Sequence, residues 1–290
     1  MLQLNNVCKN YEGFSIRNVS FTLPAGYVMG LIGPNGAGKS TTIKMIMNLA
    51  KRKSGDIHIF GKDNVKFEKE IKQHIGFVYD ENHYYDDLTC EQMKRIVAPF
   101  YKNWDEGKYQ LYMERLQVPN KKKIKQLSKG MKMKYGIAMA LSHHAKLIIM
   151  DEPTSGLDPV VRSELLDILQ EVVMEEEVSV LFSTHITTDL ERIADYITFM
   201  HNGEVAFTGE KDDILERYVI VKGSNELLDK EGRELFIGLR KSKFGFEGLA
   251  KDREAIQDWF GQEVVIEKPT LDDIVVYTAK GRGAYATARS

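Results

Sequence analysis

The chain of 290 residues carries 40 basic and 42 acidic side chains, so its formal net charge is −2. This balance argues against a nucleic-acid binder that depends on a global positive field. Hydrophobic residues at 43% and charged residues at 28% are typical of a folded globular protein and exclude a disordered or low-complexity chain. No apolar run approaches the roughly 20 residues of a membrane-spanning helix. The two cysteines, Cys8 and Cys90, are too few for a disulfide framework, so we expect reduced thiols.

Short strands are predicted at the start of the chain, over residues 2–7, 14–23 and 27–32, because β-branched residues alternate there between turn signals. From Lys39 onward the apolar spacing becomes helical. The expected buried stripe of this helix is Ile43, Ile46, Met47 and Leu49. Two further strands are predicted at residues 57–60 and 76–79.

Residues 84–145 are predicted to be mostly helical. Strands and helices then alternate over residues 147–150, 161–174, 178–182, 189–194 and 197–200. Such alternation predicts an α/β core with a mostly parallel sheet. Asn202-Gly203 favours a type I′ hairpin turn. We expect this core, with its helical subdomain at about 84–145, to end near residue 217.

Residues 218–290 have a different pattern, with short strand candidates at 219–221 and 235–238 and a helix candidate at 252–260. This favours a small accessory α+β domain. The last residues, 280–290, are small and polar, which predicts a disordered tail.

The segment GPNGAGKS at residues 33–40 fits the G-x-x-x-x-G-K-[ST] phosphate loop, between an apolar strand and a helix. Glycines let backbone N–H groups approach phosphate oxygens, and the helix N-terminus adds a positive dipole. Lys39 would reach the β- and γ-phosphates, and the Ser40 hydroxyl would bind Mg²⁺. The predicted nucleotide-binding residues of this segment are Gly33, Asn35, Gly36, Ala37, Gly38, Lys39, Ser40 and Thr41.

Two acids, Asp151 and Glu152, follow the apolar strand at residues 147–150. The carboxyl ends of parallel strands line the ligand crevice, so Asp151 would hold Mg²⁺ beside the same phosphates. Glu152 would polarise an attacking water. The alternative is that the two acids only mark the passage from the strand into a solvent-exposed loop. The phosphate loop earlier in the sequence makes this alternative less favoured.

The order of motifs resembles the ATP-binding cassette (ABC) family over about residues 1–217. The motifs are the phosphate loop, LSKGM at 127–131, DEP at 151–153, SGLD at 155–158 and His185. Within the family the chain is most similar to ATPase subunits of Gram-positive exporters of antimicrobial or amphipathic peptides, of the phenol-soluble modulin exporter type. The segment EKPTLDDI at 267–274 is similar to the closing segment of such subunits.

The resemblance implies roles for further residues. Tyr11 matches the aromatic residue that stacks on adenine; the alternative is a tyrosine on a strand surface. Ser128 and Gly130 match the signature loop, which contacts the γ-phosphate held by the partner subunit. Asp158 matches the loop that crosses the dimer interface, and His185 matches the histidine that contacts the γ-phosphate and the catalytic water.

The implied protein is a P-loop ATPase that forms a head-to-tail homodimer, or pairs with a related subunit, around two ATP molecules. Lys39, Glu152 and His185 would be catalytic, with Mg²⁺ as the metal cofactor. A multi-span permease would be the membrane partner. The chain would be cytoplasmic and peripheral on the inner face of the membrane, and no nucleic-acid partner is expected.

Three positions depart from the family pattern. Lys129 and Met131 replace a glycine and a glutamine of the signature. Asp80 stands where the family places a glutamine that binds Mg²⁺, which makes it a third candidate metal ligand, since hard cations prefer charged oxygen. The tyrosines Tyr84 and Tyr85 lie beside the expected docking groove of the permease, and ordinary packing is the alternative.

Two charge runs lie outside these motifs. The lysines at 121–123 and 125 fit a solvated loop, with contact to anionic lipid as the alternative. The glutamates at 175–177 would sit unfavourably at a helix C-terminus, so we expect them to be fully solvated.

A soluble cassette ATPase acting on ribosomes or nucleic acid is the alternative function. Such relatives usually carry two cassettes in one chain or a long coiled coil, whereas this chain has one phosphate loop, one signature and no sustained heptads. A third hypothesis gives residues 218–290 a ligand-binding, regulatory role, with stabilisation of the dimer as an equal alternative.

Overall fold

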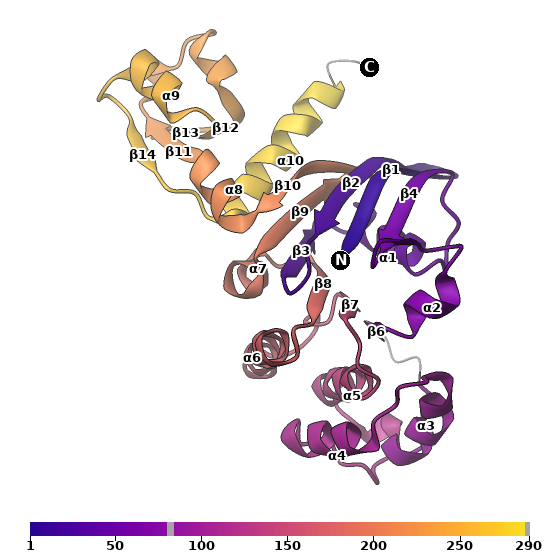
Figure 1. Ribbon diagram of the computed structural model, residues 1–290. Helices are drawn as coiled ribbons and strands as arrows, with labels where there is room; N and C mark the ends of the chain where they lie inside the picture. The colour runs from indigo at the N-terminus through magenta and orange to yellow at the C-terminus, as the bar shows by residue number, and fades with distance from the viewer. Residues whose placement is uncertain (80–83, 288–290) are drawn as a thin grey trace. The chain divides into compact units, whose positions relative to one another are not determined.

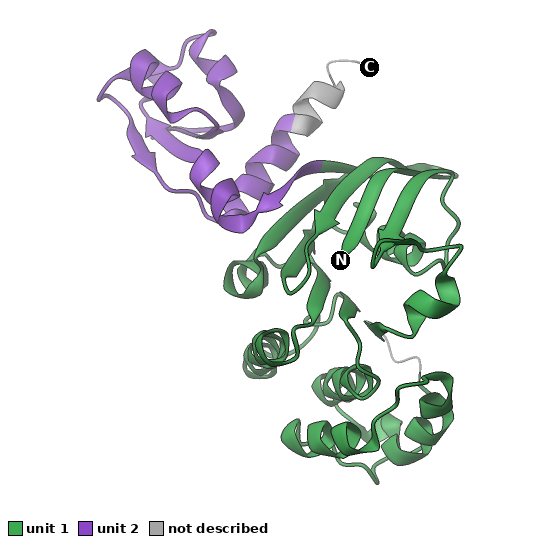
Figure 2. Ribbon diagram, in the orientation of Figure 1, with its two compact units in different colours: residues 1–205 green, residues 206–290 purple. Residues whose placement is uncertain are grey.

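The computed structural model of the protein describes residues 1–79 and 84–287 (Figure 1). Figure 2 shows two compact units, Met1–Val205 and Ala206–Ser290. They divide inside strand β10 (Glu204–Glu210), before the expected boundary at residue 217. Helix α8 (Lys211–Arg217) therefore belongs to the second unit, where its buried Ile214 packs near Gly209.

A six-stranded sheet forms the centre of the first unit, in the order β10-β9-β3-β8-β7-β6. The strands besides β10 are β9 (Tyr196–His201), β3 (Val28–Ile32), β8 (Ser179–Thr184), β7 (Leu147–Asp151) and β6 (Ile75–Val78). The pairs β3–β8, β3–β9, β7–β8 and β6–β7 are parallel, which confirms the predicted α/β core. Asn202 and Gly203 both have positive φ, at 49° and 79°, as the predicted hairpin turn requires.

A second sheet of the same unit has the order β2-β1-β4-β5. Its strands are β1 (Leu2–Tyr11), β2 (Phe14–Leu23), β4 (Ser54–Ile59) and β5 (Lys62–Asp63), and all neighbours are antiparallel. Apolar residues alternate along β1 and β2, so one face of this sheet is buried.

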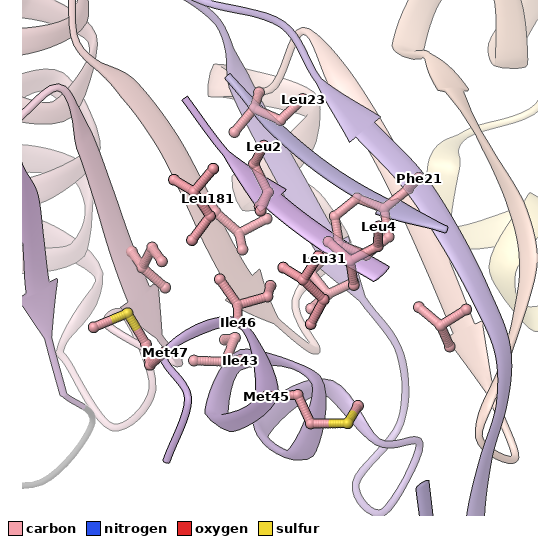
Figure 3. Packing of buried hydrophobic residues seen from close by; sticks show 14 of the residues in the cluster. Leu2, Leu4, Phe21, Leu23, Leu31, Ile43, Met45, Ile46, Met47 and Leu181 are labelled. Atoms are coloured by element: carbon pink, nitrogen blue, oxygen red, sulfur yellow. The ribbon is translucent and has the colours of Figure 1, made fainter. Parts of the chain in front are cut away.

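Helix α1 (Lys39–Ile46) packs into the main core of this unit. In Figure 3, Ile43 and Ile46 of α1 lie beside Leu31 of β3, with Leu2 and Leu4 of β1 in the same cluster. Ile43, Ile46 and Met47 are buried, as predicted. The prediction for Leu49 was wrong: it is 56% exposed, because the helix ends at Ile46 and the stripe ends with it.

The opposite face of β3 is covered by helix α7 (Thr187–Ile193). A Cβ atom at Gly30 would lie 2.5 Å from a methyl carbon of Leu190, so a larger residue there would displace the Leu190 side chain. With both faces covered, the strands are continuous apolar segments, typical of a buried parallel sheet. Helix α6 (Pro159–Glu176) packs beside α7.

Residues 84–145 form a helical region, as predicted. Its elements are α3 (Cys90–Val97), η1 (Ala98–Phe100), α4 (Glu106–Arg115), η2 (Ile124–Gln126) and α5 (Lys129–Leu141), and in Figure 1 the three α-helices gather on one side of the unit. Thr89 and Gln92 form a reciprocal capping box that fixes the start of α3. The short helix α2 (Glu68–Lys72) was not predicted.

The second unit contains an antiparallel sheet in the order β12-β13-β11-β14. The bounds are β11 (Val219–Gly223), η3 (Asn225–Leu227), η4 (Gly232–Leu235), β12 (Phe236–Ser242), β13 (Gly245–Ala250), α9 (Arg253–Phe260), β14 (Val265–Glu267) and α10 (Leu271–Thr287). Helix α10 runs to Thr287 within the described residues, where a disordered tail from residue 280 was expected. Its buried Leu271, Ile274 and Tyr277 anchor the first turns and let the helix continue.

Candidate nucleotide site

The phosphate loop leads from β3 into α1 through backbone conformations that glycine supplies. Gly36 and Gly38 have φ of 79° and 107°, and the Ala37 N–H donates to the carbonyl of Pro34 at 3.1 Å. Helix α1 begins at Lys39 without a side-chain cap from the described residues. Its first N–H groups therefore point out of the helix end toward the loop, an arrangement suited to an anion.

Close packing also limits the loop to small residues. A Cβ atom at Gly33 would lie 2.3 Å from the carbonyl oxygen of Met200, and one at Gly38 would lie 2.4 Å from Ile16. Asn35 is exposed at the tip of the loop, whereas Ala37 is buried. The neighbouring strands β9 and β2 thus hold the loop from behind and leave its outer side for a ligand.

The side chain of Lys39 is only 5% exposed and folds back into the loop. Its Nζ donates to the Gly33 carbonyl at 2.7 Å and lies 3.4 Å from the Pro34 carbonyl. The same atom lies 3.1 Å from Oε1 of Glu152. This ion pair joins the phosphate loop to the acidic end of β7, two segments more than 100 residues apart in sequence.

Glu152 is held in an unusual backbone conformation, with φ of 47°. Its N–H donates to both the carbonyl and the Oγ of Ser183 on β8, at 3.1 and 3.0 Å. Its second carboxylate oxygen lies 2.8 Å from Nδ1 of His185, whose side chain is 44% exposed. A left-handed conformation is uncommon for a residue with a side chain and is found preferentially at functional sites.

Asp151 is the last residue of β7 and directly precedes Glu152. The Ser183 hydroxyl donates to one of its carboxylate oxygens at 2.5 Å. Ser183 therefore fixes both acids, through Asp151 and through the Glu152 N–H. Our sequence reasoning missed Ser183; its signal is a polar residue inside the apolar strand that precedes His185.

A hydroxyl and a carboxylate are the hard oxygen donors that Mg²⁺ prefers, and Ser40 and Asp151 supply them on α1 and β7, two elements in contact. In the part of the chain that the structure describes, no three His, Cys, Asp or Glu side chains form a complete metal cluster. A site completed by phosphate oxygens and water needs no such cluster, so these residues fit Mg²⁺ bound with nucleotide. The third candidate ligand, Asp80, lies outside the described residues.

Tyr11 is the last residue of β1 and is 47% exposed. The Nζ of Lys9 lies 4.6 Å from the centre of its ring and donates to the Lys51 carbonyl at 2.7 Å. A cation against an aromatic ring restrains its orientation. The ring is thus accessible for stacking, while its position is set by the protein.

The signature residues have roles within this chain. Ser128 caps α5, accepting from the Met131 N–H at 3.2 Å. Helix α5 begins at Lys129, directly after this cap. Gly130 is buried against α6, where a Cβ atom would lie 2.4 Å from Val161. The exposed Asp158 caps α6 in the same way, accepting from two backbone N–H groups at 3.0 and 3.1 Å.

Ser128 is exposed, so the N-terminus of α5 lies at the surface.

Lys39, Glu152, Asp151 and His185 form one connected site around the phosphate loop, through the contacts of Glu152 and Ser183. Contacts of Ser128, Gly130 and Asp158 with nucleotide would involve a second chain and stay predictions.

Comparison with known proteins identifies the family. The family model described as ABC transporter matches residues 16–155. ABC transporter ATP-binding protein YtrB of Bacillus subtilis (strain 168) is 30% identical over 77% of this chain and 76% of its own length. Bacitracin transport ATP-binding protein BcrA of Bacillus licheniformis is 34% identical, over 66% and 63% respectively. Lantibiotic transport ATP-binding protein SrtF of Streptococcus pyogenes is 34% identical, over 73% and 92%.

Solved structures agree with this result. An ATP-binding subunit of an ABC transporter is 31% identical, with a TM-score of 0.66 over 74% of this chain and 92% of its own. A dimeric structure of MJ0796, a bacterial ABC transporter cassette, is 25% identical, with a TM-score of 0.63 over 72% and 98%. The chain belongs to the ABC transporter family and carries its ATP-binding, ATP-hydrolysing cassette.

Proposed function

We propose that this chain is the ATP-hydrolysing subunit of a membrane exporter of amphipathic or antimicrobial peptides. The observation that carries the ATPase part is the connected set Lys39–Glu152–His185 at the phosphate loop. The names of the relatives support the peptide part, because BcrA is a bacitracin transport protein and SrtF a lantibiotic transport protein. The phenol-soluble modulin type of exporter remains our finer hypothesis within this class.

The reaction we propose is in-line attack of water on the γ-phosphoryl group. Lys39 exchanges its contact with Glu152 for phosphate oxygens, since both are anionic ligands of the same Nζ. Glu152 is then available to orient the water and accept its proton. His185, 2.8 Å from that carboxylate, stabilises the charge that develops on the γ-phosphoryl oxygens.

Mg²⁺ bound with ATP supplies charge neutralisation at the β- and γ-phosphates. Ser40 and Asp151 would hold it, and the Ser183 hydroxyl orients the Asp151 carboxylate toward this task. Tyr11 would stack on adenine, an interaction that suits a flat base and reads none of its edges. Gly33, Asn35, Gly36, Ala37, Gly38 and Thr41 would complete the phosphate and nucleotide contacts.

The active form we propose is a head-to-tail homodimer. The exposed Ser128 with Gly130 would contact the γ-phosphate of the partner's ATP through the N-terminus of α5, and Asp158 would lie at the interface. Dimeric ABC cassettes among the solved structures support this arrangement.

The permease would dock beside Tyr84. A cavity of about 650 Å³ lies there, against β6, α3 and α5. Part of its lining is Tyr79, Tyr84, Met93, Tyr101, Met139 and His143. His143 stacks on Tyr101 at 3.7 Å, and burial lowers the pKa of His143 to about 4, so its ring is neutral near pH 7.

The Nδ1 atom of His143 is buried without a hydrogen-bond partner among the described residues. A cytoplasmic segment of a permease with apolar side chains would fit this cavity. No helix among the described residues is long and apolar enough to cross a membrane. Attachment to the membrane would therefore depend on that partner.

Residues 218–290 would form an accessory domain. The match to SrtF covers 92% of that relative but only 73% of this chain. A relative in this family therefore lacks most of the residues that this chain has beyond the matched part. The antiparallel sheet β12-β13-β11-β14 has its own apolar core, built around Val221, Phe246 and Ile256. We propose that this domain stabilises or regulates the dimer.

The test is a pull-down of tagged Glu152→Gln protein, with ATP and Mg²⁺, from detergent-solubilised membranes of the native host. Co-purification of a multi-span protein is expected, and a Tyr101→Ala variant that still binds ATP should recover much less of it. Recovery of ribosomes or of soluble proteins alone would overturn the exporter proposal and favour a soluble cassette.

The substrate class needs a separate experiment. A host that lacks this gene should become more sensitive to an amphipathic cationic peptide, and the wild-type gene, but not Glu152→Gln, should restore resistance. Unchanged sensitivity to a panel of such peptides would contradict the peptide assignment.

A further inference from the structure

Asp189 on α7 is a buried carboxylate that belongs to none of the motifs recognised in the sequence. It is 1% exposed and lies four residues after His185. A buried carboxylate is retained only when donors satisfy it, because desolvation of an unpaired charge is costly. The identity of its donors indicates what this residue does.

Two donors reach Asp189 from the segment that follows Glu152. The Thr154 hydroxyl donates to one carboxylate oxygen at 2.7 Å. The Nε of Arg162, on α6, donates to the other oxygen, and a second nitrogen of Arg162 donates to Thr188 at 2.9 Å. Thr154 is itself 1% exposed, so this contact is shielded from water.

The connection to Glu152 is short and stiff. Only Pro153 separates Glu152 from Thr154, and the ring of proline fixes its own φ. Ser183 holds the Glu152 N–H on one side, while Thr154 is anchored to Asp189 on the other. The left-handed backbone of Glu152 therefore lies between two fixed points.

The two helices are also tied together elsewhere. Arg192 of α7 donates to Ser163 at 2.8 Å and pairs with Asp167, both on α6 and on the more exposed side. Loss of the Asp189 contacts would therefore leave α6 and α7 packed. The contacts of Asp189 with Thr154 and Arg162 instead fix the ends of α6 and α7 that lie nearest Glu152 and His185.

We infer that Asp189 is a positioning residue that fixes Glu152 relative to His185 through Thr154 and Arg162. This inference depends on the proposed catalytic roles of Glu152 and His185. Misplacement of a catalytic group by about 1 Å lowers turnover without changing the groups that bind substrate. The expected signature is a change of kcat with an unchanged affinity for ATP.

The test compares Thr154→Val with Thr154→Ser in the full-length chain. Valine matches threonine in shape but lacks the hydroxyl, so kcat for ATP should fall about tenfold or more while the Kd for ATP stays within about twofold. Serine keeps the donor and should restore most of the turnover. Equal kcat for the two variants would overturn the inference.

Controls separate positioning from general stability. Arg192→Gln removes the side-chain contacts of Arg192 with Ser163 and Asp167 and should lower Tm without the fall in kcat. If Arg192→Gln lowers kcat as much as Thr154→Val at equal Tm, the role of Asp189 is merely structural. Asp189→Asn weakens the pair with Arg162 as well as the contact with Thr154, so it should lower kcat at least as much as Thr154→Val, again with an unchanged Kd for ATP.

The background variant Glu152→Gln distinguishes this inference from the proposed function. Thr154→Val should leave the residual turnover of Glu152→Gln unchanged, since it acts through Glu152. A further fall there would contradict the inference. If Glu152→Gln itself retains normal turnover, the proposed catalytic assignment fails instead.

Discussion

Glu152 and His185 are joined directly, with 2.8 Å between a carboxylate oxygen and Nδ1 of the imidazole. The other oxygen of Glu152 lies 3.1 Å from Nζ of Lys39. One carboxylate thus contacts both groups that we assign to the γ-phosphate. Binding of ATP is expected to compete with Glu152 for Lys39, which links occupancy of the phosphate loop to release of the catalytic carboxylate.

Replacement of Lys39 by alanine should weaken ATP binding by about ten- to a hundredfold, because a charge-assisted hydrogen bond to phosphate is worth about 1.5–3 kcal/mol. Titration with a fluorescent ATP analogue measures this effect. Lys44→Ala, an exposed lysine on the same helix, controls for the loss of one positive charge. An unchanged Kd for Lys39→Ala would remove Lys39 from the nucleotide site.

Replacement of Tyr11 by alanine should weaken ATP binding by about tenfold, in line with the 1–3 kcal/mol that stacking of a base on an aromatic ring contributes. Tyr11→Phe keeps the ring and should bind normally. GTP binding should fall by a similar factor, because stacking reads no base edges. Equal affinities of Tyr11→Ala and Tyr11→Phe would favour the alternative of a strand-surface tyrosine.

Asp63 is expected to make a pH-dependent contribution to the free energy of unfolding. Backbone N–H donors, first that of Lys66, together with Arg52 lower the pKa of Asp63 below its usual value of 3.8. Because the folded pKa is depressed, the stabilisation is complete above pH 3.8 and is lost as the pH falls through the folded pKa. Asp63→Asn should thus cost about 1 kcal/mol of unfolding free energy at pH 7 and much less near pH 2.

Denaturant unfolding at the two pH values measures that difference. Asp56→Asn, an exposed carboxylate on the adjacent strand β4, controls for the loss of one negative charge. A destabilisation by Asp63→Asn that is equal at pH 7 and pH 2 would contradict the assignment of the effect to ionised Asp63.

Local patterns predicted much of the first unit. The strand before residue 33 and the helix from Lys39 depend on glycine positions and apolar spacing within about 20 residues, and both were confirmed. The hairpin at Asn202-Gly203 was confirmed for the same reason, since a two-residue turn carries its own conformational requirement.

Interactions between segments that are distant in sequence could not be predicted from such local patterns. The prediction that the glutamates at 175–177 are fully solvated was wrong for Glu176, because α4 supplies partners that no local pattern reveals, whereas Glu175 and Glu177 are exposed. Arg115 pairs with Glu175, and Glu176 pairs with Lys108 at 2.5 Å while accepting from the Tyr112 hydroxyl. The anchoring of Thr154 by Asp189, 35 residues away, was missed for the same reason.

Short elements of the second unit also escaped prediction. Strand β14 has three residues and depends on pairing with β11, and β13 contains two glycines that weaken its strand pattern. At Gly248 a Cβ atom would lie 2.5 Å from Phe236, so a residue of low strand propensity is required by packing across the sheet.

We propose that Glu152 activates water in an ATP site that includes Lys39. The most direct test measures ATP turnover and ATP binding of Glu152→Gln beside wild type. We expect turnover to fall by about 10²- to 10⁴-fold, the contribution of a general base, while ATP binds at least as tightly because Lys39 loses a competing carboxylate. Near-normal turnover, or loss of ATP binding, would contradict it.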